Sequence, residues 1–286
     1  MHTPEQSRHG ILMDPDEFRA SYERTSFRVR HDLVSHPLLA AEAFTALASE
    51  IPPGHLEYLA GHLGDLAPDH RTELGGEPTA MLQRIHDAGS GAVWVAFHRP
   101  EVVPKFQVLL DEMLDPIAEL VPAMGARESY LFMSGPDWST PCHRDPEHNF
   151  LLQIRGTKSV TVGEFVDDDT RHRELERSYS QSGVYSSFRP AHPKVVELGP
   201  GDGLYIPPDM LHLARNGPEL SISYSVAWRP PELVRTGRVY EFNAWLREHG
   251  RTPTPPGRSV WLDRQKAGMV WARLGAKRVF GRRARG

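Results

Sequence analysis

Cysteine and long apolar runs are what this 286-residue chain has least of. Its only cysteine is Cys142, which excludes an internal disulfide and a cysteine-based zinc cluster, so any metal would need histidine and carboxylate ligands. No hydrophobic run approaches the roughly 18 residues of a membrane span. The first residues, Met-His-Thr-Pro-Glu-Gln, lack the basic-then-apolar layout of a signal peptide. These absences predict a cytoplasmic protein with no membrane partner.

Charge is unevenly distributed along the chain. Hydrophobic residues make up 39% and charged residues 24%, as in a soluble globular protein of one large domain with helical flanks or two ordinary domains. Residues 258–286 hold nine Lys and Arg and one Asp, which leaves 24 basic and 36 acidic residues elsewhere. The tail is therefore +8 and the body −12. The basic tail can contact the acidic body, an acidic partner or nucleic acid, and the body is the expected contact.

Residues 1–91 predict a mostly helical region. Asp14 and Asp16 precede a short amphipathic run, and Ser35 can cap a helix over 37–50. Between these helices, residues 26–31 alternate like a strand. Residues 62–91 are rich in Gly, Asp and His and predict a loop region with one helix near 80–88.

Residues 92–230 predict a β-rich core. Short strand-like runs broken by Gly and Pro, with a helix over 108–120 that Pro116 kinks or interrupts, favour an antiparallel barrel or sandwich over a parallel sheet. The runs are 92–97, 128–133, 149–154, 158–162, 194–197 with 203–206, and 221–228. The polar stretch 163–192 is too long for a hairpin turn and predicts an insertion over the barrel mouth. Residues 231–286 predict a helical, basic extension, with helices over 232–249 and 261–279.

Three side chains predict a metal site. His143 and Asp145 are two residues apart, which on a strand points both to one face. His212 in a later strand can supply the third ligand. Two histidines and one carboxylate form a facial triad with open positions, the set suited to non-haem Fe(II) oxygenases. The alternatives are a surface His143 with Asp145 in a turn before Pro146, and His212 capping a turn.

The spacing around these ligands resembles the two motifs of the cupin superfamily. Gly201, Pro207, His212 and Asn216 are separated by five, four and three residues, with Asp209 where Gly is usual. His143, Asp145, Asn149 and Gly156 match the first motif, with Asp for its second His and Asn for its Glu. The resemblance implies a mainly β fold with helical flanks: a double-stranded β-helix core with N-terminal and C-terminal helices.

Thr140 and Lys158 extend the resemblance to JmjC-type Fe(II)- and 2-oxoglutarate-dependent oxygenases, including the asparaginyl hydroxylase branch. In that family the equivalent Thr and Lys bind the distal carboxylate of 2-oxoglutarate and the Asn, here Asn149, its metal-bound end. This assignment agrees with the chemistry, because a dicarboxylate that chelates iron at one end needs a cation and a hydroxyl at its other end. Ser223 or Ser225 could contact the cosubstrate from a neighbouring strand. An exposed Lys158 is the alternative.

Four segments also look like a group of bacterial cupin-like proteins of similar length: 28–39, 145–156, 221–225 and 253–259. The resemblance implies Fe(II), 2-oxoglutarate and O2 as cofactor and cosubstrates, with a protein or peptide side chain or a small metabolite as the substrate. It also implies a homodimer through the C-terminal helices. Glu147 stands where the asparaginyl hydroxylase has Gln, and a second Asn of that enzyme is absent from 221–228, which argues against asparagine as the substrate.

Two other functions remain open at the level of the sequence. One is a metal-dependent cupin that does not use 2-oxoglutarate, such as an isomerase, a lyase or a thiol or ring dioxygenase. The other is a non-catalytic sensor that binds a ligand in the barrel and nucleic acid through the basic tail. Hydroxylation and demethylation are equally compatible with the motifs.

Overall fold

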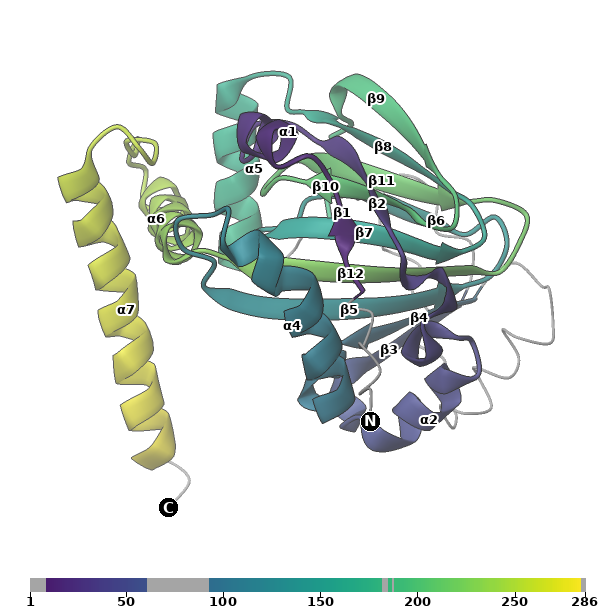
Figure 1. Ribbon diagram of the computed structural model, residues 1–286. Coiled ribbons are helices and arrows are strands. Elements are labelled where there is room, and N and C mark those ends of the chain that lie inside the picture. The colour runs from purple at the N-terminus through teal and green to yellow at the C-terminus, as the bar shows by residue number, and fades with distance from the viewer. Residues whose placement is uncertain (1–8, 61–92, 182–184, 187, 284–286) are drawn as a thin grey trace.

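The strands of the protein form two antiparallel sheets that face each other (Figure 1). The computed structural model describes residues 9–60, 93–181, 185–186 and 188–283. The large sheet has the order β1-β2-β10-β7-β12-β5-β4-β3 and the small sheet the order β6-β11-β8-β9. The strands of the large sheet are Ile11–Leu12 (β1), Phe27–His31 (β2), Asp202–Ile206 (β10), His148–Arg155 (β7), Ser221–Arg229 (β12), Ala126–Ser134 (β5), Val93–His98 (β4) and Leu56–Ala60 (β3). The strands of the small sheet are Ser139–His143 (β6), Leu211–Asn216 (β11), Lys158–Glu164 (β8) and Ala191–Leu198 (β9).

Helices cover one face of the large sheet and one end of the barrel (Figure 1). The α-helices are Pro15–Ser21 (α1), Ala43–Glu50 (α2), Pro104–Ala118 (α4), Asp168–Gln181 (α5), Pro231–Glu248 (α6) and Val260–Arg283 (α7). Short 3-10 helices span Leu33–Ser35, Pro37–Leu39, Pro53–His55 and Pro100–Val102. This arrangement confirms the predicted double-stranded β-helix core with N-terminal and C-terminal helices.

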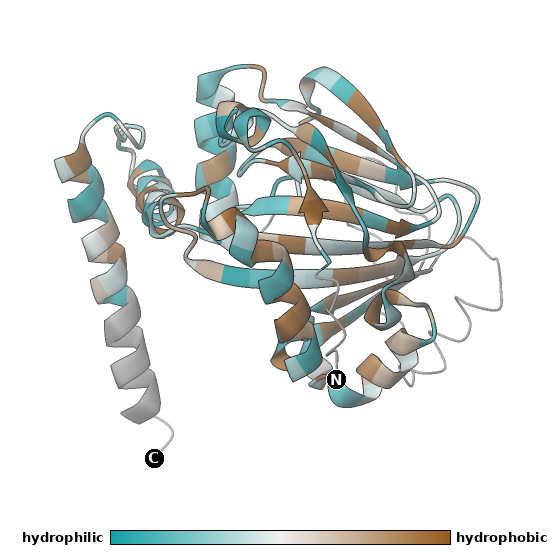
Figure 2. Ribbon diagram, viewed as in Figure 1, coloured by the Kyte–Doolittle hydropathy of each residue, from teal (hydrophilic) through white to brown (hydrophobic). Residues whose placement is uncertain are grey.

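The alternation of side chains along the strands divides the interior into two layers. In β7, Phe150, Leu152 and Ile154 point to the outer face, where they pack with the apolar sides of α1, α2 and α4. The residues between them point into the barrel, toward an apolar cluster built on Val160, Val162, Val196, Leu198, Leu204, Ile206 and Ala214. In Figure 2 the hydrophobic colouring accordingly marks α4 and the strands of both sheets. The inner layer is the one that carries the site.

One predicted helix was wrong in detail, and one helix is present that the sequence did not predict. The expected helix over 37–50 divides into a 3-10 turn and α2, because Ala40 is extended (φ −68°, ψ 146°). The insertion over 163–192 contains α5, which begins where the Asp167 side chain accepts a hydrogen bond from the Thr170 amide. The buried face of α5 includes polar residues such as Glu174 and Ser178. Its residues therefore lack the apolar periodicity by which a helix is identified in sequence.

The flanking regions are attached to the core in different ways. The N-terminal region supplies helices and also β1 and β2, which extend the large sheet beyond β10, and β3, which pairs with β4. The loop and helix expected within 62–91 lie outside the described residues.

Pro116 lies inside α4 without ending it. Among the described helices, none has an apolar stretch long enough to cross a membrane.

Candidate metal centre

The register between β6 and β11 brings two histidines side by side. His143 is the last residue of β6 and pairs directly with His212, the second residue of β11. The next pair is Thr140 with Ala214, so three steps on β6 match two on β11. This bulge keeps His143 and Thr140 on one face despite their odd spacing. The ring centroids of His143 and His212 are 4.0 Å apart.

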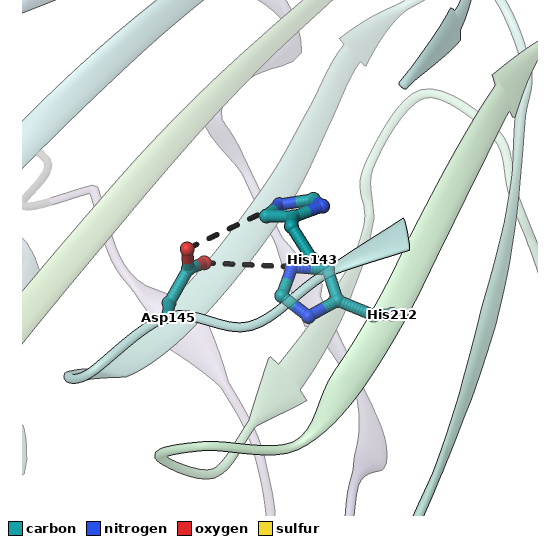
Figure 3. Close-up of side chains that lie close together, drawn as sticks. All are labelled: His143, Asp145 and His212. Carbon is teal, nitrogen blue, oxygen red and sulfur yellow. Dashed lines mark ion pairs between the residues drawn. The ribbon is translucent and has the colours of Figure 1, made fainter. Parts of the chain in front are cut away.

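Asp145 completes the group from the loop after β6. One ligand atom from each of His143, Asp145 and His212 lies within 4.8 Å of the others (Figure 3). The expectation that a shared strand aligns His143 with Asp145 was wrong, because β6 ends at His143. The chain instead turns after the histidine, and the Asp145 carboxylate points back toward both rings.

Backbone carbonyls fix the orientation of both rings. His143 Nδ1 lies 2.8 Å from the Pro141 carbonyl oxygen, and His212 Nδ1 lies 3.0 Å from that of Met210. A carbonyl only accepts, so each Nδ1 donates and each Nε2 is left to face Asp145. The Nε2 to carboxylate distances are 4.0 Å from His143 and 3.4 Å from His212.

The electrostatics of the three groups suit metal ligation. Burial, helped by the charge of His212, lowers the pKa of His143 to about 4. Burial opposes charge on His212 and Asp145 as well, but their mutual hydrogen bond raises the pKa of His212 and holds that of Asp145 below its usual range. A neutral His143, a carboxylate and a second imidazole with its Nε2 directed inward are the donor set that Fe(II) accepts, so the residues fit this ion.

Lys158 is buried inside the barrel, although lysine side chains are rarely buried in proteins. It is the first residue of β8 and is 7% exposed. Its Nζ donates to Asn216 Oδ1 at 2.8 Å, and the Asn216 amide in turn donates to Ser134 Oγ and to the Gly135 carbonyl. Burial lowers the pKa of Lys158 to about 8. The sequence motif contained Asn216 but did not reveal that it holds the lysine.

The other predicted cosubstrate residues also face the interior. Ala214 belongs to the inner apolar cluster, so its partner Thr140 lies on the same face. Asn149 and Ser225 are buried on neighbouring strands, and the serine hydroxyl donates to Asn149 Oδ1. The structure thus brings the predicted residues to the interior of one barrel. Lys158 lies opposite Asn216 at one end of β11, and the metal ligands lie around His212 near the other end.

A second charged group lies beside the triad; the sequence singled out Glu147 but not the residues that pair with it. The buried Glu147 carboxylate accepts hydrogen bonds from Arg229 at 2.8 Å and from the Tyr130 hydroxyl at 3.3 Å. Burial, together with the nearby charge of Asp145, raises the pKa of Glu147 to about 7. Tyr130 comes from β5 and Arg229 from the end of β12, so this group forms only when the sheet is assembled. Arg144 and Asp209, also missed, are described below.

Two residues near the motif lie outside the site, as expected. His148 stacks between Tyr22 and Trp228 with ring centroids 4.7 and 4.8 Å away, and burial lowers its pKa to about 3. Cys142 is 1% exposed, and burial raises the pKa of its thiol to about 11. A neutral core histidine and an un-ionised buried thiol are structural residues.

Fold and side chains together define a cupin-like barrel with a His-x-Asp and His metal-ligand set. Residues 101–235 match the JmjC domain family. A stretch of 96 residues is 28% identical to the Jumonji C domain-containing protein 5 of Drosophila melanogaster, covering 30% of this chain and 24% of that protein. The chain thus matches about a quarter of the length of this curated relative.

Solved structures share the fold over a longer range. A structure of YcfD, a ribosomal oxygenase from Escherichia coli, superposes with a TM-score of 0.54 at 16% identity, covering 93% of this chain and 68% of that one. A second YcfD structure, in complex with cobalt and 2-oxoglutarate, gives a TM-score of 0.56 with the same identity and coverage. Residues 101–235 thus resemble the JmjC domain family, and the shared fold agrees with the cupin-like resemblance of the two motifs.

Proposed function

We propose that the protein is an Fe(II)- and 2-oxoglutarate-dependent oxygenase that hydroxylates an unactivated C–H bond. The observation that carries the proposal is a buried ammonium group, Lys158, in the same barrel as the His143, Asp145 and His212 triad. A metal site alone serves many cupin reactions. A metal site combined with a buried cation is what a metal-chelating dicarboxylate requires.

The spacing between the two groups supports this cosubstrate. Asn216, which binds the Lys158 ammonium, is four residues beyond His212 on β11, a separation of about 13 Å along the strand. Lys158 pairs directly with Asn216 across the two strands, and its ammonium stays within hydrogen-bonding distance of that residue. The interval between the ammonium and the triad suits a five-carbon dicarboxylate whose 2-oxo acid end reaches the metal. Thr140 lies between these levels, opposite Ala214, where its hydroxyl can donate to the distal carboxylate.

Each residue has a distinct part in the proposed reaction. His143, Asp145 and His212 would hold Fe(II), which supplies the activation of O2 coupled to oxidative decarboxylation of 2-oxoglutarate. Lys158 and Thr140 bind the distal carboxylate, while Asn149 and Ser225 orient the metal-bound end. The apolar cluster of β8, β9 and β10 excludes water from the barrel.

The substrate is proposed at the level of its class, as a protein or peptide side chain or a small metabolite. The largely buried group of Glu147, Arg229 and Tyr130 interacts electrostatically with Asp145, and neither the metal ligands nor Lys158 use it. YcfD is described as a ribosomal oxygenase, and its complex holds cobalt and 2-oxoglutarate. Both points support an oxygenase reaction without naming the substrate.

Turnover without added substrate tests the proposal. Purified protein with Fe(II), ascorbate and 2-oxoglutarate is expected to form succinate slowly, and His143→Ala is expected to abolish it. Lys158→Ala distinguishes this proposal from a cupin that does not use 2-oxoglutarate. It should raise the 2-oxoglutarate requirement steeply in the first case and change the activity little in the second. If 2-oxoglutarate neither binds nor turns over at any iron loading, the proposed function is wrong. A cytoplasmic location, a homodimer through the C-terminal helices and a tail bound to the acidic body are further proposals.

A further inference from the structure

Arg144 lies between two metal ligands and points away from them. His143 and Asp145 face the barrel interior, whereas the Arg144 side chain is directed to the opposite side, where it is 2% exposed. Its guanidinium donates from Nη1 to Asp209 Oδ1 and from Nη2 to Ser178 Oγ, both at 2.7 Å. It also lies over the ring of Tyr179, 4.2 Å from the centroid. Ser178 and Tyr179 belong to α5.

Asp209 is the counterpart on the other ligand-bearing segment. It precedes His212 by three residues, and its amide donates to the Asp145 carbonyl oxygen at 2.7 Å. Its backbone is left-handed (φ 62°), a conformation that favours glycine, the residue usual here in the cupin motif. Keeping an aspartate at this position has a conformational cost. The side chain offsets this cost by pairing with Arg144, while Arg171 of α5 lies 3.8 Å away.

The segment after α5 holds the same loop from its other side. The Ser186 amide donates to the Cys142 carbonyl at 2.9 Å, and Tyr185 forms an antiparallel bridge with His143. Arg177 of α5 donates to the Tyr185 carbonyl at 2.7 Å. The loop with His143 and Asp145 is therefore attached to α5 through Arg144 and to residues 185–186 through the backbone.

We propose that the buried Arg144–Asp209 ion pair is a positioning device that locks the two ligand-bearing segments against α5 and so sets the affinity of the metal site. The pair joins the segment of His143 and Asp145 to that of His212 by one ion pair and one backbone hydrogen bond. Removing Asp209 leaves the Arg144 charge buried without a described ion-pair partner, and removing Arg144 leaves Asp209 with only its longer contact to Arg171; both states are costly, and the loop relieves them by shifting. A small shift of Arg144 moves the ligands on either side of it. The inference rests on the metal-binding part of the proposed function.

The size of the effect follows from how outer residues tune metal sites. Loss of a residue that orients the ligands typically weakens metal affinity by 10- to 100-fold. Asp209→Gly removes the charge while relieving the left-handed backbone, so any loss of affinity arises from the missing pair. Arg144→Met removes the other charge. In the double variant no buried charge remains unpaired, so its loss is expected to be smaller than the product of the two single losses.

The experiment is titration of the metal-free protein with Co(II), followed by the ligand-field absorption of the ion and by calorimetry. Asp209→Gly and Arg144→Met are each expected to raise the Kd about 10- to 100-fold and to alter the absorption bands. Asp209→Asn, which retains a hydrogen-bond acceptor and tolerates the left-handed backbone, carries the test if the other variants do not fold. Its Kd is expected to rise about tenfold, at the lower end of this range.

Glu176→Gln is the matched control. Glu176 is buried on the same helix and pairs with Arg247 of α6, away from the ligand loops. It is expected to lower the melting temperature and leave the Co(II) Kd and spectrum unchanged. An equal loss of affinity in Glu176→Gln, wild-type affinity in folded Asp209→Asn, or single losses that multiply in the double variant would each overturn the proposal. Wild-type protein that binds Co(II) but forms no succinate refutes only the proposed function, whereas wild-type protein without Co(II) binding refutes both.

Discussion

Replacing Lys158 by methionine removes a buried charge while keeping a flexible side chain of similar shape. The Lys158 ammonium has Asn216 Oδ1 as its hydrogen-bond partner, and burial alone accounts for its lowered pKa. In the proposed complex the distal carboxylate of 2-oxoglutarate supplies the missing negative charge. Truncating one partner of a buried, hydrogen-bonded charge pair costs about 2–5 kcal/mol. At 1.4 kcal/mol per tenfold, the Kd for 2-oxoglutarate should rise about 30- to 4,000-fold.

Calorimetric titration of metal-loaded protein with 2-oxoglutarate, without O2, measures this change directly. Lys194→Met is the matched control, because Lys194 is an exposed lysine on the adjacent strand β9. Its Kd should equal that of the wild type. A Kd in Lys158→Met within about threefold of the wild type, a difference below 1 kcal/mol, would refute the assignment of this lysine to the cosubstrate.

The titration of Lys158 gives the same prediction a pH dependence. With a pKa of about 8 in the ligand-free protein, the ammonium is present below pH 8 and is lost above it. Affinity for 2-oxoglutarate should therefore be constant below pH 8 and fall by up to about tenfold per pH unit above it. Lys158→Arg stays charged throughout this range, so any affinity that it retains should not fall with pH.

Stability should respond in the opposite direction. The pKa of Lys158 falls from 10.5 to about 8 on folding, so the unfolded chain binds more protons between these values. Stability without ligand is therefore expected to rise with pH in that window. At neutral pH, holding the charge inside costs about 3 kcal/mol. Lys158→Met should accordingly unfold at a higher denaturant concentration than the wild type, so its weak cosubstrate binding cannot be explained by misfolding.

Three further predictions concern the surroundings of the site. Asn216→Ala should weaken 2-oxoglutarate binding by a factor of about 3 to 10, less than Lys158→Met, because it removes one orienting hydrogen bond; calorimetry checks this, and an equal loss would contradict it. Gly156→Ala should destabilise the protein by more than about 1–2 kcal/mol, because φ is +69° and a Cβ would lie 2.5 Å from the Leu220 carbonyl oxygen. Gly268→Ala, where a Cβ meets nothing within 4 Å, is its control in chemical denaturation. Light scattering of the full chain should give twice the mass of one chain, and a monomer at all concentrations would refute the proposed dimer.

The sequence predicted the metal-ligand residues better than the contacts that hold them in place. Fixed spacings identified His143, Asp145 and His212 because cupin strands are short and their turns are tight, so chain distance reflects spatial distance. The expected strand position of Asp145 was wrong, because its placement depends on where β6 ends. The sequence also did not predict α5, because its buried face includes polar residues. Arg144 and Asp209 are 65 residues apart, and no local pattern relates them.

The hydrogen bonding inside the barrel distinguishes Lys158 from the other buried polar residues. The polar side chains between the sheets largely satisfy one another: the Gln153 amide donates to Ser221, the Ser223 hydroxyl donates to Gln153, and Ser225 pairs with Asn149. Such a network is compatible with a stable core because each buried group has a partner. Lys158 has a hydrogen-bond acceptor but no described carboxylate to balance its charge. Under the proposed function, 2-oxoglutarate binding offsets the cost of burying that charge, so the protein is expected to be more stable with this dicarboxylate than without it.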